Sequence, residues 1–382
     1  MRVHRIQLSH ENDISFELLD ENDQPIPVVS GFMRQLRARG YSPNTLSAYV
    51  FDLLHFMTFL KEQQLTYQEF TPPHALLFLE YLTTLPRRGH ARRLGLVLCT
   101  TEHGQATTRL SPATINRTFA TVSSFYEYLI LSGQFTEREN PIQKVEDHAL
   151  ERVSERHQPF MGRASRQQPI RRAVRVKTVQ RVPRPMDDEQ VNLLLASLRL
   201  KRDKAMLLLM LHGGLRPGEV LSLHLEDLQY GRRRVIIRYR TDHPKRVRTK
   251  SRTERYVDLH ESETLAAVND YAMHERPTDS NGPYLFLVGG RGKNRCEPLG
   301  YHALVKLFAR HCERLGMRDP WVTPHALRHT HATRMFEQGM RELTLQKRLG
   351  HASPESTRIY TQVSDPQMVA EYRRALGEEE QE

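Results

Sequence analysis

The feature that most constrains this chain is a polar segment near its end, residues 324–360. The segment contains His325 and Arg328 in the run HALRH, His351 in the run LGH, and Tyr360 shortly after. The Thr-Pro pair that opens it is typical of a helix start, because proline already has a helical φ and has no amide donor. Residues three apart lie on one helix face, so we expect His325 and Arg328 to be neighbours.

These side chains suit chemistry on a phosphodiester. Attack on phosphorus adds charge to the non-bridging oxygens, and arginine offers them a planar fork of donors that is always charged. Histidine can donate or move a proton near neutral pH. A tyrosine hydroxyl can be the nucleophile and remain bonded to the phosphate. The segment therefore indicates phosphoryl transfer on DNA without a metal ion.

A further arginine of this kind, Arg216, follows a strongly apolar predicted helix at residues 205–211. Two glycines turn the chain before it and Pro217 can open the next helix, so its guanidinium can reach a cleft. Glu219 can pair with an arginine or cap that helix. A single arginine before proline is usually a surface residue, but the run GLRPGE argues against that reading.

Together these motifs resemble the C-terminal signature of the tyrosine recombinase (phage integrase) family. That family also uses a lysine at the turn of a β-hairpin, and here the predicted strands 233–239 and 255–259 flank a basic stretch. Lys250 matches the lysine best, and Lys245 is the second choice; alternatively, Lys250 is one of many basic side chains that contact phosphates. The resemblance implies this catalytic set: Arg216, Lys250, His325, Arg328, His351 and Tyr360.

The resemblance also implies a mechanism. Tyr360 would attack a scissile phosphate and form a 3′-phosphotyrosyl link, while the two arginines hold the non-bridging oxygens. Lys250 would protonate the departing 5′ oxygen, His325 would act as base or hydrogen-bond donor, and His351 would hold the phosphate. Because the covalent link conserves the energy of the broken bond, we expect no ATP and no other cofactor.

A metal site is the alternative for the histidines His325, His329 and His331. The spacing His-x-x-x-His places two imidazoles on one helix face, as a zinc site requires. However, the glutamate of the HExxH motif is absent and Arg328 lies between the histidines, where it disfavours a cation. We expect no metal ion; His331 should be a packed side chain, and His329 should support the site or the core.

The region between residues 28 and 145 has apolar residues at helical spacing, and Ser-Pro pairs at Ser42 and Ser111 are typical helix starts. It resembles the helical core-binding (SAM-like) domain of the same family. The tract 151–184 then holds ten lysines and arginines against two glutamates, which is typical of an extended linker. Such a linker would contact DNA phosphates; the alternative is a solvated tether.

We therefore predict a mainly α fold with a small β-sheet (α+β), in which a helical core-binding domain precedes a tyrosine-recombinase catalytic domain. A weak strand is expected near residues 14–18. A last helix at residues 365–376 would cover its own domain or, as the resemblance implies, dock on a neighbouring protomer. The predicted divisions are an N-terminal leader (1–24), the core-binding domain (25–146), a basic linker (147–185), the catalytic domain (186–376) and an acidic tail (377–382).

Composition limits the partners and the compartment. The net charge of +11 favours a polyanion. The three cysteines form no CxxC pair, which is typical of a chain in the reducing cytosol, and no apolar run is long enough to cross a bilayer. We expect a cytoplasmic, nucleoid-associated protein without a membrane partner. The resemblance implies double-stranded DNA with specific recombination sites as the partner, and a homo-tetramer on that DNA.

Two other functions remain open at this point. A type IB topoisomerase uses similar residues and the same tyrosyl intermediate, but rejoins the original ends. A non-catalytic DNA-binding protein could retain the fold with a decayed site. The helical N-terminal region argues for a recombinase, for integration, excision or transposition, and the complete set of six residues argues for an enzyme.

Overall fold

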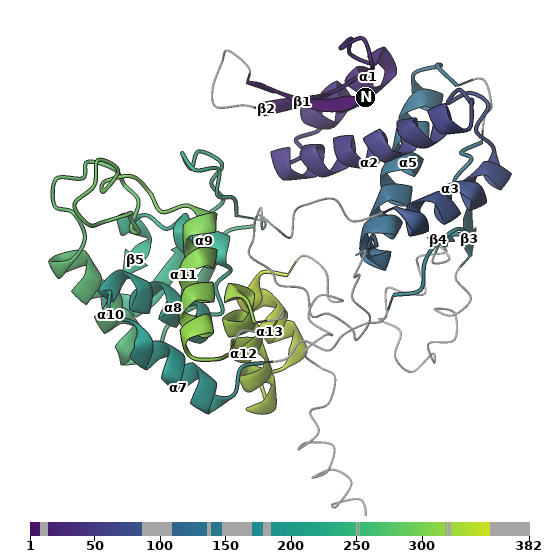
Figure 1. Cartoon of the computed structure of the whole chain (residues 1–382). Helices are drawn as coiled ribbons and strands as arrows, with labels where there is room; N and C mark the ends of the chain where they lie inside the picture. Colours follow the sequence, from purple (N-terminus) through teal and green to yellow (C-terminus); the bar gives the residue numbers. More distant parts are fainter. Residues whose placement is uncertain are drawn as a thin grey trace, which may run out of the picture. The chain divides into compact units, whose positions relative to one another are not determined.

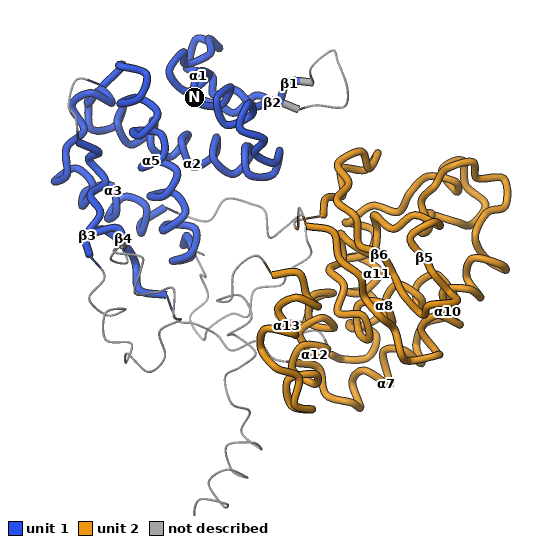
Figure 2. Tube along the Cα trace, turned by 180° about the vertical axis from the view of Figure 1, so that it is seen from behind, with its two compact units in different colours: residues 1–180 blue, residues 181–382 orange. Residues whose placement is uncertain are grey.

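The computed structural model describes residues 1–7, 14–85, 109–135, 139–146, 170–178, 185–249, 251, 253–317, 319 and 322–351. The chain divides into two compact units, residues 1–180 (unit 1) and 181–382 (unit 2), shown in Figures 1 and 2. Both are mainly helical with short antiparallel sheets, which confirms the predicted fold class. No helix in these ranges is long and apolar enough to cross a membrane.

Unit 1 is a group of helices with a hairpin at its start. The two hairpin strands pair antiparallel with Val3 opposite Leu18. In chain order the unit contains β1 (Arg2–Gln7), β2 (Ile14–Leu19), α1 (Pro27–Ala38), α2 (Pro43–Glu62), α3 (Pro72–Thr84), α5 (Pro112–Leu131), β3 (Lys144–Glu146) and β4 (Ile170–Arg172).

Local signals start the two longest helices of unit 1. The hydroxyl of Ser42 accepts a hydrogen bond from the amide of Thr45 at 3.1 Å, and that of Ser111 accepts one from Thr114 at 3.2 Å. In both helices the residue after the serine is proline, at the first helical position. Both helix starts predicted from the Ser-Pro pairs are therefore confirmed.

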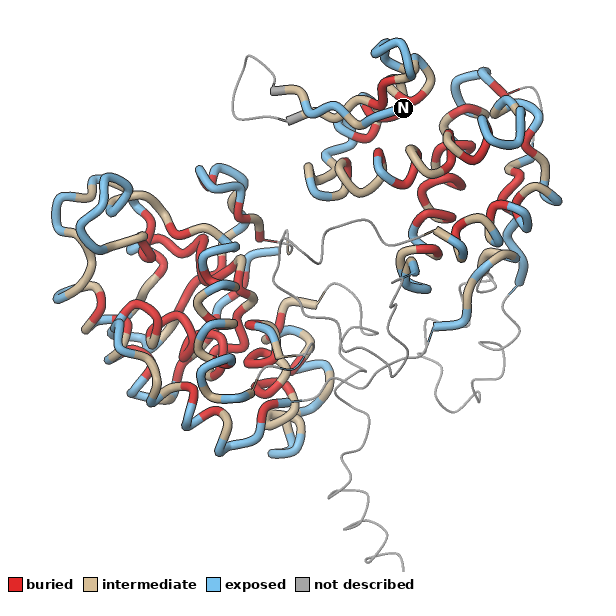
Figure 3. The backbone as a smooth tube through the Cα atoms, in the orientation of Figure 1, coloured by how far each residue is buried: buried red, intermediate tan, exposed pale blue. Residues whose placement is uncertain are grey.

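Aromatic side chains fill the core of unit 1. Phe56, in the middle of α2, packs with its ring centroid 5.0 Å from that of Phe70 and 5.4 Å from that of Phe78. Phe125 and Tyr126 of α5 complete the cluster at 6.4 and 6.0 Å. Figure 3 shows the buried stretches of these helices facing one another. These aromatic side chains are core residues of unit 1. Of the five, only Phe125 belongs to an apolar stripe that the helical spacing predicted.

Two segments outside the predicted core-binding domain also belong to unit 1. Within the predicted leader, Leu18 on β2 is fully buried in the aromatic core. Within the predicted linker, β4 pairs with β3, and the Asn116 side chain bonds both the amide and the carbonyl of Val176. Residues 170–178 are therefore attached to unit 1, because a short apolar and hydrogen-bonded stretch interrupts the basic tract.

Unit 2 contains most of the polar motifs. Its three-stranded sheet is antiparallel in the order β5-β6-β7, with Val235 opposite Val257. In chain order the elements are α7 (Asp188–Ser197), α8 (Lys201–His212), α9 (Pro217–Leu221), β5 (Leu228–Gln229), β6 (Arg234–Ile237), β7 (Arg255–Asp258), α10 (Ser262–His274), α11 (Tyr301–Arg314), α12 (Pro324–Glu337) and α13 (Glu342–Leu349), with short 3-10 turns at Leu225–Asp227 and Tyr230–Arg232.

The apolar helix α8 is the centre of unit 2. Every residue from position 205 to 211 is buried, and the helix packs against α10 and α12 (Figure 1). A helix that is apolar on all sides must be surrounded by other elements. Its C-terminal end therefore lies inside the unit, and the turn that carries Arg216 begins there.

Candidate active site

Arg216 is the N-cap residue of α9. Between α8 and α9 the chain turns at Gly214, whose φ of +63° lies in the left-handed region. A Cβ at this position would lie 2.5 Å from the ring of His331, so the turn requires glycine. The glycines and Pro217 therefore place Arg216 at the tight turn that the sequence predicted.

Arg328 lies one turn into α12 and is buried, with 3% of its surface exposed. Its Nη1 donates to the carbonyl of Gly214 at 2.6 Å, and its Nη2 donates to the carbonyl of Leu349 at 2.8 Å. One guanidinium thus joins three segments that are distant in the sequence: α12, the α8–α9 turn and the end of α13.

The segment 349–351 is where the predicted residues meet. Arg216 donates from Nη1 to the carbonyl of Leu349 and from Nη2 to that of Gly350, both at 3.2 Å. It therefore shares the Leu349 acceptor with Arg328. The Nε2 atom of His351 lies 2.8 Å from Nη2 of Arg328. Three of the six predicted residues, from three separate motifs, are together in space.

His351 is held as a neutral imidazole. Its backbone amide donates to the carbonyl of Gln346, and Gly350 before it ends α13 with a φ of +64°. Burial first, and then the positive charges of Arg328 and Arg216, lower the pKa of His351 to about 3. Because Nε2 accepts a hydrogen bond from Arg328, the hydrogen-bond geometry assigns the proton to Nδ1.

A buried carboxylate, Glu219, lies among the arginines. Its Oε1 accepts from Nη1 of Arg216 at 2.8 Å, and its Oε2 accepts from the backbone amide of Arg216 at 2.8 Å. Nη1 of Arg328 is 3.8 Å from Oε2. Burial would raise the pKa of Glu219, but the hydrogen bonds and charge of Arg255, then the charges of Arg328 and Arg216, lower it to about 2. Glu219 both caps α9 and pairs with arginine, as predicted.

The histidines of α12 differ in their surroundings. His325, in the first turn, and His329 are half-buried. Burial, and then the charge of Arg328, lower the pKa of His329. His331 is 2% exposed and accepts a hydrogen bond at Nε2 from Arg348 at 3.1 Å, which confirms that it is a packed side chain. In the part of the chain that is described, no three His, Cys, Asp or Glu are arranged to hold a metal.

Two predicted residues, Lys250 and Tyr360, lie outside the described residues. Just before Lys250, Thr249 is buried, and its hydroxyl accepts from the amide of Arg240 at 3.3 Å across the hairpin. Lys245, the second choice for the catalytic lysine, forms an ion pair with Glu297 at 2.6 Å. The predicted helix at residues 365–376, the acidic tail and most of the basic linker also lie outside the described ranges.

Two arginines next to the site, Arg255 and Arg348, were not predicted from the sequence. Arg255 donates two hydrogen bonds to Glu219, and Arg348 donates to the carbonyls of His212 and Asp258. The sequence contained a signal for Arg255. It lies two residues before Val257 in a predicted strand, so both side chains are on the same, buried face. An arginine on that face must have a partner inside the protein.

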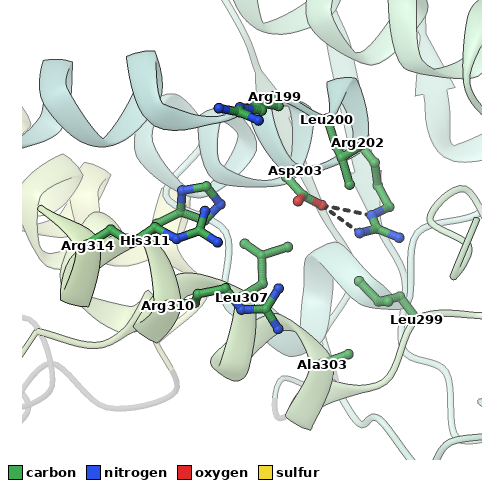
Figure 4. Close-up of a pocket in the computed structure, with 10 residues that line it drawn as sticks. All are labelled: Arg199, Leu200, Arg202, Asp203, Leu299, Ala303, Leu307, Arg310, His311 and Arg314. Carbon is green, nitrogen blue, oxygen red and sulfur yellow. Dashed lines mark hydrogen bonds and ion pairs between the residues drawn. The ribbon is translucent and has the colours of Figure 1, made fainter. Parts of the chain in front are cut away.

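A separate cavity of about 260 Å³ lies in unit 2 between the α7–α8 connection and α11 (Figure 4). Arg202 and Asp203 form an ion pair at 2.8 Å on its wall. Leu299 and Leu307 give it an apolar side. None of the four described residues of the predicted set, Arg216, His325, Arg328 and His351, lines this cavity, so it is separate from the place where three of them meet.

Two models of one protein family match this chain. A model of the phage integrase family matches residues 184–367, and a model of the phage integrase N-terminal SAM-like domain matches residues 29–133. The chain belongs to the phage integrase family, the tyrosine recombinases, enzymes that cut and rejoin DNA strands. The resemblance inferred from the motifs is confirmed.

Two curated relatives match over most of their length. Transposase A from transposon Tn554 of Staphylococcus aureus is 28% identical over 384 residues, which cover 100% of this chain and 99% of the relative. Tyrosine recombinase XerC of Herpetosiphon aurantiacus is 28% identical over 336 residues, which cover 87% of this chain and 88% of the relative.

Solved structures show the same fold. The Tn1549 transposon integrase in complex with transposon right end DNA has a TM-score of 0.59 at 18% identity, covering 91% of this chain and 99% of that one. The XerH site-specific recombinase bound to its palindromic difH substrate also has a TM-score of 0.59, at 17% identity, covering 92% of this chain and 85% of that one.

Proposed function

We propose that this recombinase cuts DNA at specific sites and rejoins the strands to new partners, in integration, excision or transposition of a DNA element. The single observation that carries the proposal is the meeting of Arg216, Arg328 and His351 at residues 349–351. The proposed catalytic set is Arg216, Lys250, His325, Arg328, His351 and Tyr360.

In the proposed reaction the Tyr360 hydroxyl oxygen attacks the scissile phosphorus in line with the 5′ oxygen of the next nucleotide. The phenolic proton passes to His325 or to water. A bond forms between the tyrosine and the 3′ phosphate, and the bond to the 5′ oxygen breaks. Lys250 gives that oxygen a proton. The 5′-hydroxyl of a partner strand then attacks the phosphotyrosine, so no cofactor is consumed.

Arginine and histidine would stabilise the charge that develops on the phosphate. The guanidinium groups of Arg216 and Arg328 share the Leu349 carbonyl as acceptor. They are therefore close enough to bind the two non-bridging oxygens of one phosphate. His351 is neutral at physiological pH because of its low pKa, so it would contribute a hydrogen bond from Nδ1 rather than a charge. Glu219 would keep Arg216 in place.

The partner in this proposal is double-stranded DNA that carries the recombination sites. The structural relatives include recombinases whose structures contain DNA, and one relative along the full length of the chain is a transposase. Unit 1 and the basic linker would grip the DNA, with unit 2 as the catalytic domain. Four copies would assemble on two sites, in the cytoplasm at the nucleoid, and the helix at residues 365–376 would dock on a neighbouring copy.

The test uses a nicked DNA duplex in which cleavage releases a short fragment and traps the covalent complex. The wild-type chain should form a covalent product, and Tyr360→Phe should form none while it binds the site nearly as tightly in a gel-shift assay. Loss of binding together with cleavage would contradict the role of Tyr360.

A second assay separates the two remaining enzyme classes. A plasmid with two sites is scored for exchange between the sites and for relaxation of supercoils. We expect recombinant products that depend on both sites. Relaxation without exchange would indicate a type IB topoisomerase, and neither product, together with retained site binding, would indicate a DNA-binding protein without catalysis.

A further inference from the structure

Arg255 is a buried arginine at the start of β7, and 8% of its surface is exposed. Its Nη1 and Nη2 donate to the two oxygens of Glu219 at 3.0 and 2.7 Å, which is a bidentate pair. Its Nε donates to the carbonyl of Arg348 at 2.9 Å. One side chain therefore contacts the carboxylate below Arg216 and the chain that leads into residues 349–351.

The contact with Glu219 keeps this buried carboxylate ionised. Each oxygen of Glu219 accepts one hydrogen bond from Arg216 and one from Arg255. Among the arginines, Arg255 contributes most to holding this buried carboxylate ionised. If Arg255 were absent, the partners of this carboxylate among the described residues would be Arg216 and Arg328, and both would be drawn toward it and away from a bound phosphate.

The second contact fixes the position of α13. Arg255 of β7 bonds the backbone of Arg348 in α13, and Arg348 in turn donates to the carbonyl of Asp258 in β7 at 3.1 Å. Arg348 also bonds the carbonyl of His212 at 3.1 Å. One arginine thus donates from the sheet to the helix and the other from the helix to the sheet. The helix ends at Leu349, whose carbonyl accepts from both Arg216 and Arg328.

The glycine after this helix shows how close the contact is. A Cβ on Gly350 would lie 2.8 Å from Nη1 of Arg255 and 3.0 Å from its Cζ. Distances this short require the guanidinium or the loop to move. The segment 349–351 therefore closes directly over the Arg255 side chain, and its path depends on where that side chain lies.

We propose that Arg255 is a positioning residue for strand cleavage: it fixes Glu219 and residues 349–351 so that Arg216 and Arg328 can bind one phosphate together. This inference rests on the proposed function. It adds to the proposed catalytic set a buried residue that acts through Glu219 and the end of α13. It also links the site to the hairpin that carries Lys250, five residues earlier in the sequence.

The test compares Arg255→Met with a matched control, Arg234→Met. Arg234 lies on the neighbouring strand β6 and forms a similar bidentate pair with Asp258, at 2.6 and 3.1 Å, outside the site. Single-turnover cleavage of the nicked duplex should slow on the order of 10²-fold for Arg255→Met, as for loss of a transition-state donor. Arg234→Met should change the cleavage rate less than about threefold, because an ion pair at the surface has a small effect.

A modified substrate separates positioning from a general loss of structure. In a methylphosphonate, one non-bridging oxygen of the scissile phosphate is replaced by methyl, so the charge that the arginines offset is removed. The defect of Arg255→Met should shrink at least about tenfold on this DNA, since arginine placement then matters less. An equal defect on both substrates would overturn the proposal, as would wild-type cleavage by Arg255→Met.

Two further variants keep the test decisive. If Arg255→Met fails to fold, Arg255→Lys replaces it, because lysine keeps the charge without the fork; the same reduction on the methylphosphonate is expected. Adding Glu219→Gln to Arg255→Met removes the carboxylate charge that would draw Arg216 and Arg328 away from the phosphate, and should restore part of the cleavage rate. A double variant no faster than Arg255→Met would contradict the charge argument. The proposed function itself is judged separately, by covalent trapping with wild type and Tyr360→Phe.

Discussion

The two units are stabilised in different ways. Unit 1 is packed around aromatic rings, and the buried ionic group in its described part is Asp52, which accepts hydrogen bonds from Arg117, Thr118 and Thr121. Unit 2 has an aliphatic core and several buried ionic groups, among them Glu219 with its three arginines. The unit with more buried ionic groups is the one that contains the motifs of the proposed catalytic set.

The difference follows from the groups that each unit has to bury: aromatic rings in unit 1 and charged side chains in unit 2. An aromatic core needs no partner beyond other apolar side chains. A site for phosphate needs arginines that are fixed before the substrate arrives, and a guanidinium taken out of water is costly unless it is paired. In unit 2 the pairing comes from Glu219 and from backbone carbonyls. If the proposed site is correct, stability and catalysis are coupled in unit 2 but not in unit 1.

The largest effect should come from the aromatic core. Phe56→Ala removes the ring at the centre of the cluster and should lower the free energy of unfolding of unit 1 by about 3–5 kcal/mol. Urea unfolding followed by circular dichroism measures it. Trp321 is the one tryptophan in the sequence and falls within residues 181–382, the range of unit 2, so the unfolding transition followed by its fluorescence should be unchanged.

The matched control is Leu131→Ala, at a side chain 81% exposed on α5, which should have almost no effect. A fall in the Trp321 transition with Phe56→Ala would mean that the two units do not unfold independently, and the contrast between them would be lost.

The next largest effect should be on chemistry. Arg328→Lys keeps a charge but cannot bond Gly214, Leu349 and a phosphate at once, so cleavage of bound DNA should slow about 10²–10³-fold. Single-turnover cleavage at saturating enzyme measures it. Arg117→Lys alters a bidentate pair of unit 1 and should leave that rate unchanged. Equal losses in the two variants would show that the site is not confined to unit 2.

An intermediate effect should depend on pH. Burial first, and then the charge of Arg348, lower the pKa of His331 to about 3, below the unfolded value of about 6.5. The unfolded chain then binds the extra proton, so stability is complete above pH 6.5 and declines as the pH falls toward 3. The slope from this group is about 1.4 kcal/mol per pH unit.

Urea unfolding of unit 2, followed by Trp321 fluorescence between pH 7 and pH 4.5, measures the slope. His331→Gln should reduce it by about that amount. His302→Gln, at an exposed histidine of α11, should leave the slope as in wild type. If His331→Gln had the wild-type slope, the loss of stability in acid would have to come from other groups.

The smallest effect should come from a helix cap. Ser111→Ala removes the acceptor for the Thr114 amide and should destabilise unit 1 by about 1 kcal/mol. Ser111→Asp keeps an acceptor for that amide and should lower the stability of unit 1 much less. The urea midpoint of the circular dichroism transition gives both values, and a destabilisation by Asp as large as that by Ala would exclude the capping explanation.

Much of the fold could be predicted because its signals are local. The caps at Ser42 and Ser111 and the apolar helix at residues 205–211 act through neighbours a few positions away. The burial of Leu18 and the pairing of residues 170–172 with β3 were missed, since they depend on segments far away in the chain. No short pattern marks such contacts.

For the site, the sequence by itself determined which side chains are present, because the motifs around Arg216, Arg328, His351 and Tyr360 each have a distinct local spacing. Only the tertiary structure decided that the first three meet at the carbonyls of residues 349 and 350, and that Arg255 holds Glu219 beneath them. The physical reason is that every residue has a carbonyl, so the sequence cannot show which one will accept an arginine. Packing selects it, when α8, β7, α12 and α13 bury their apolar faces together.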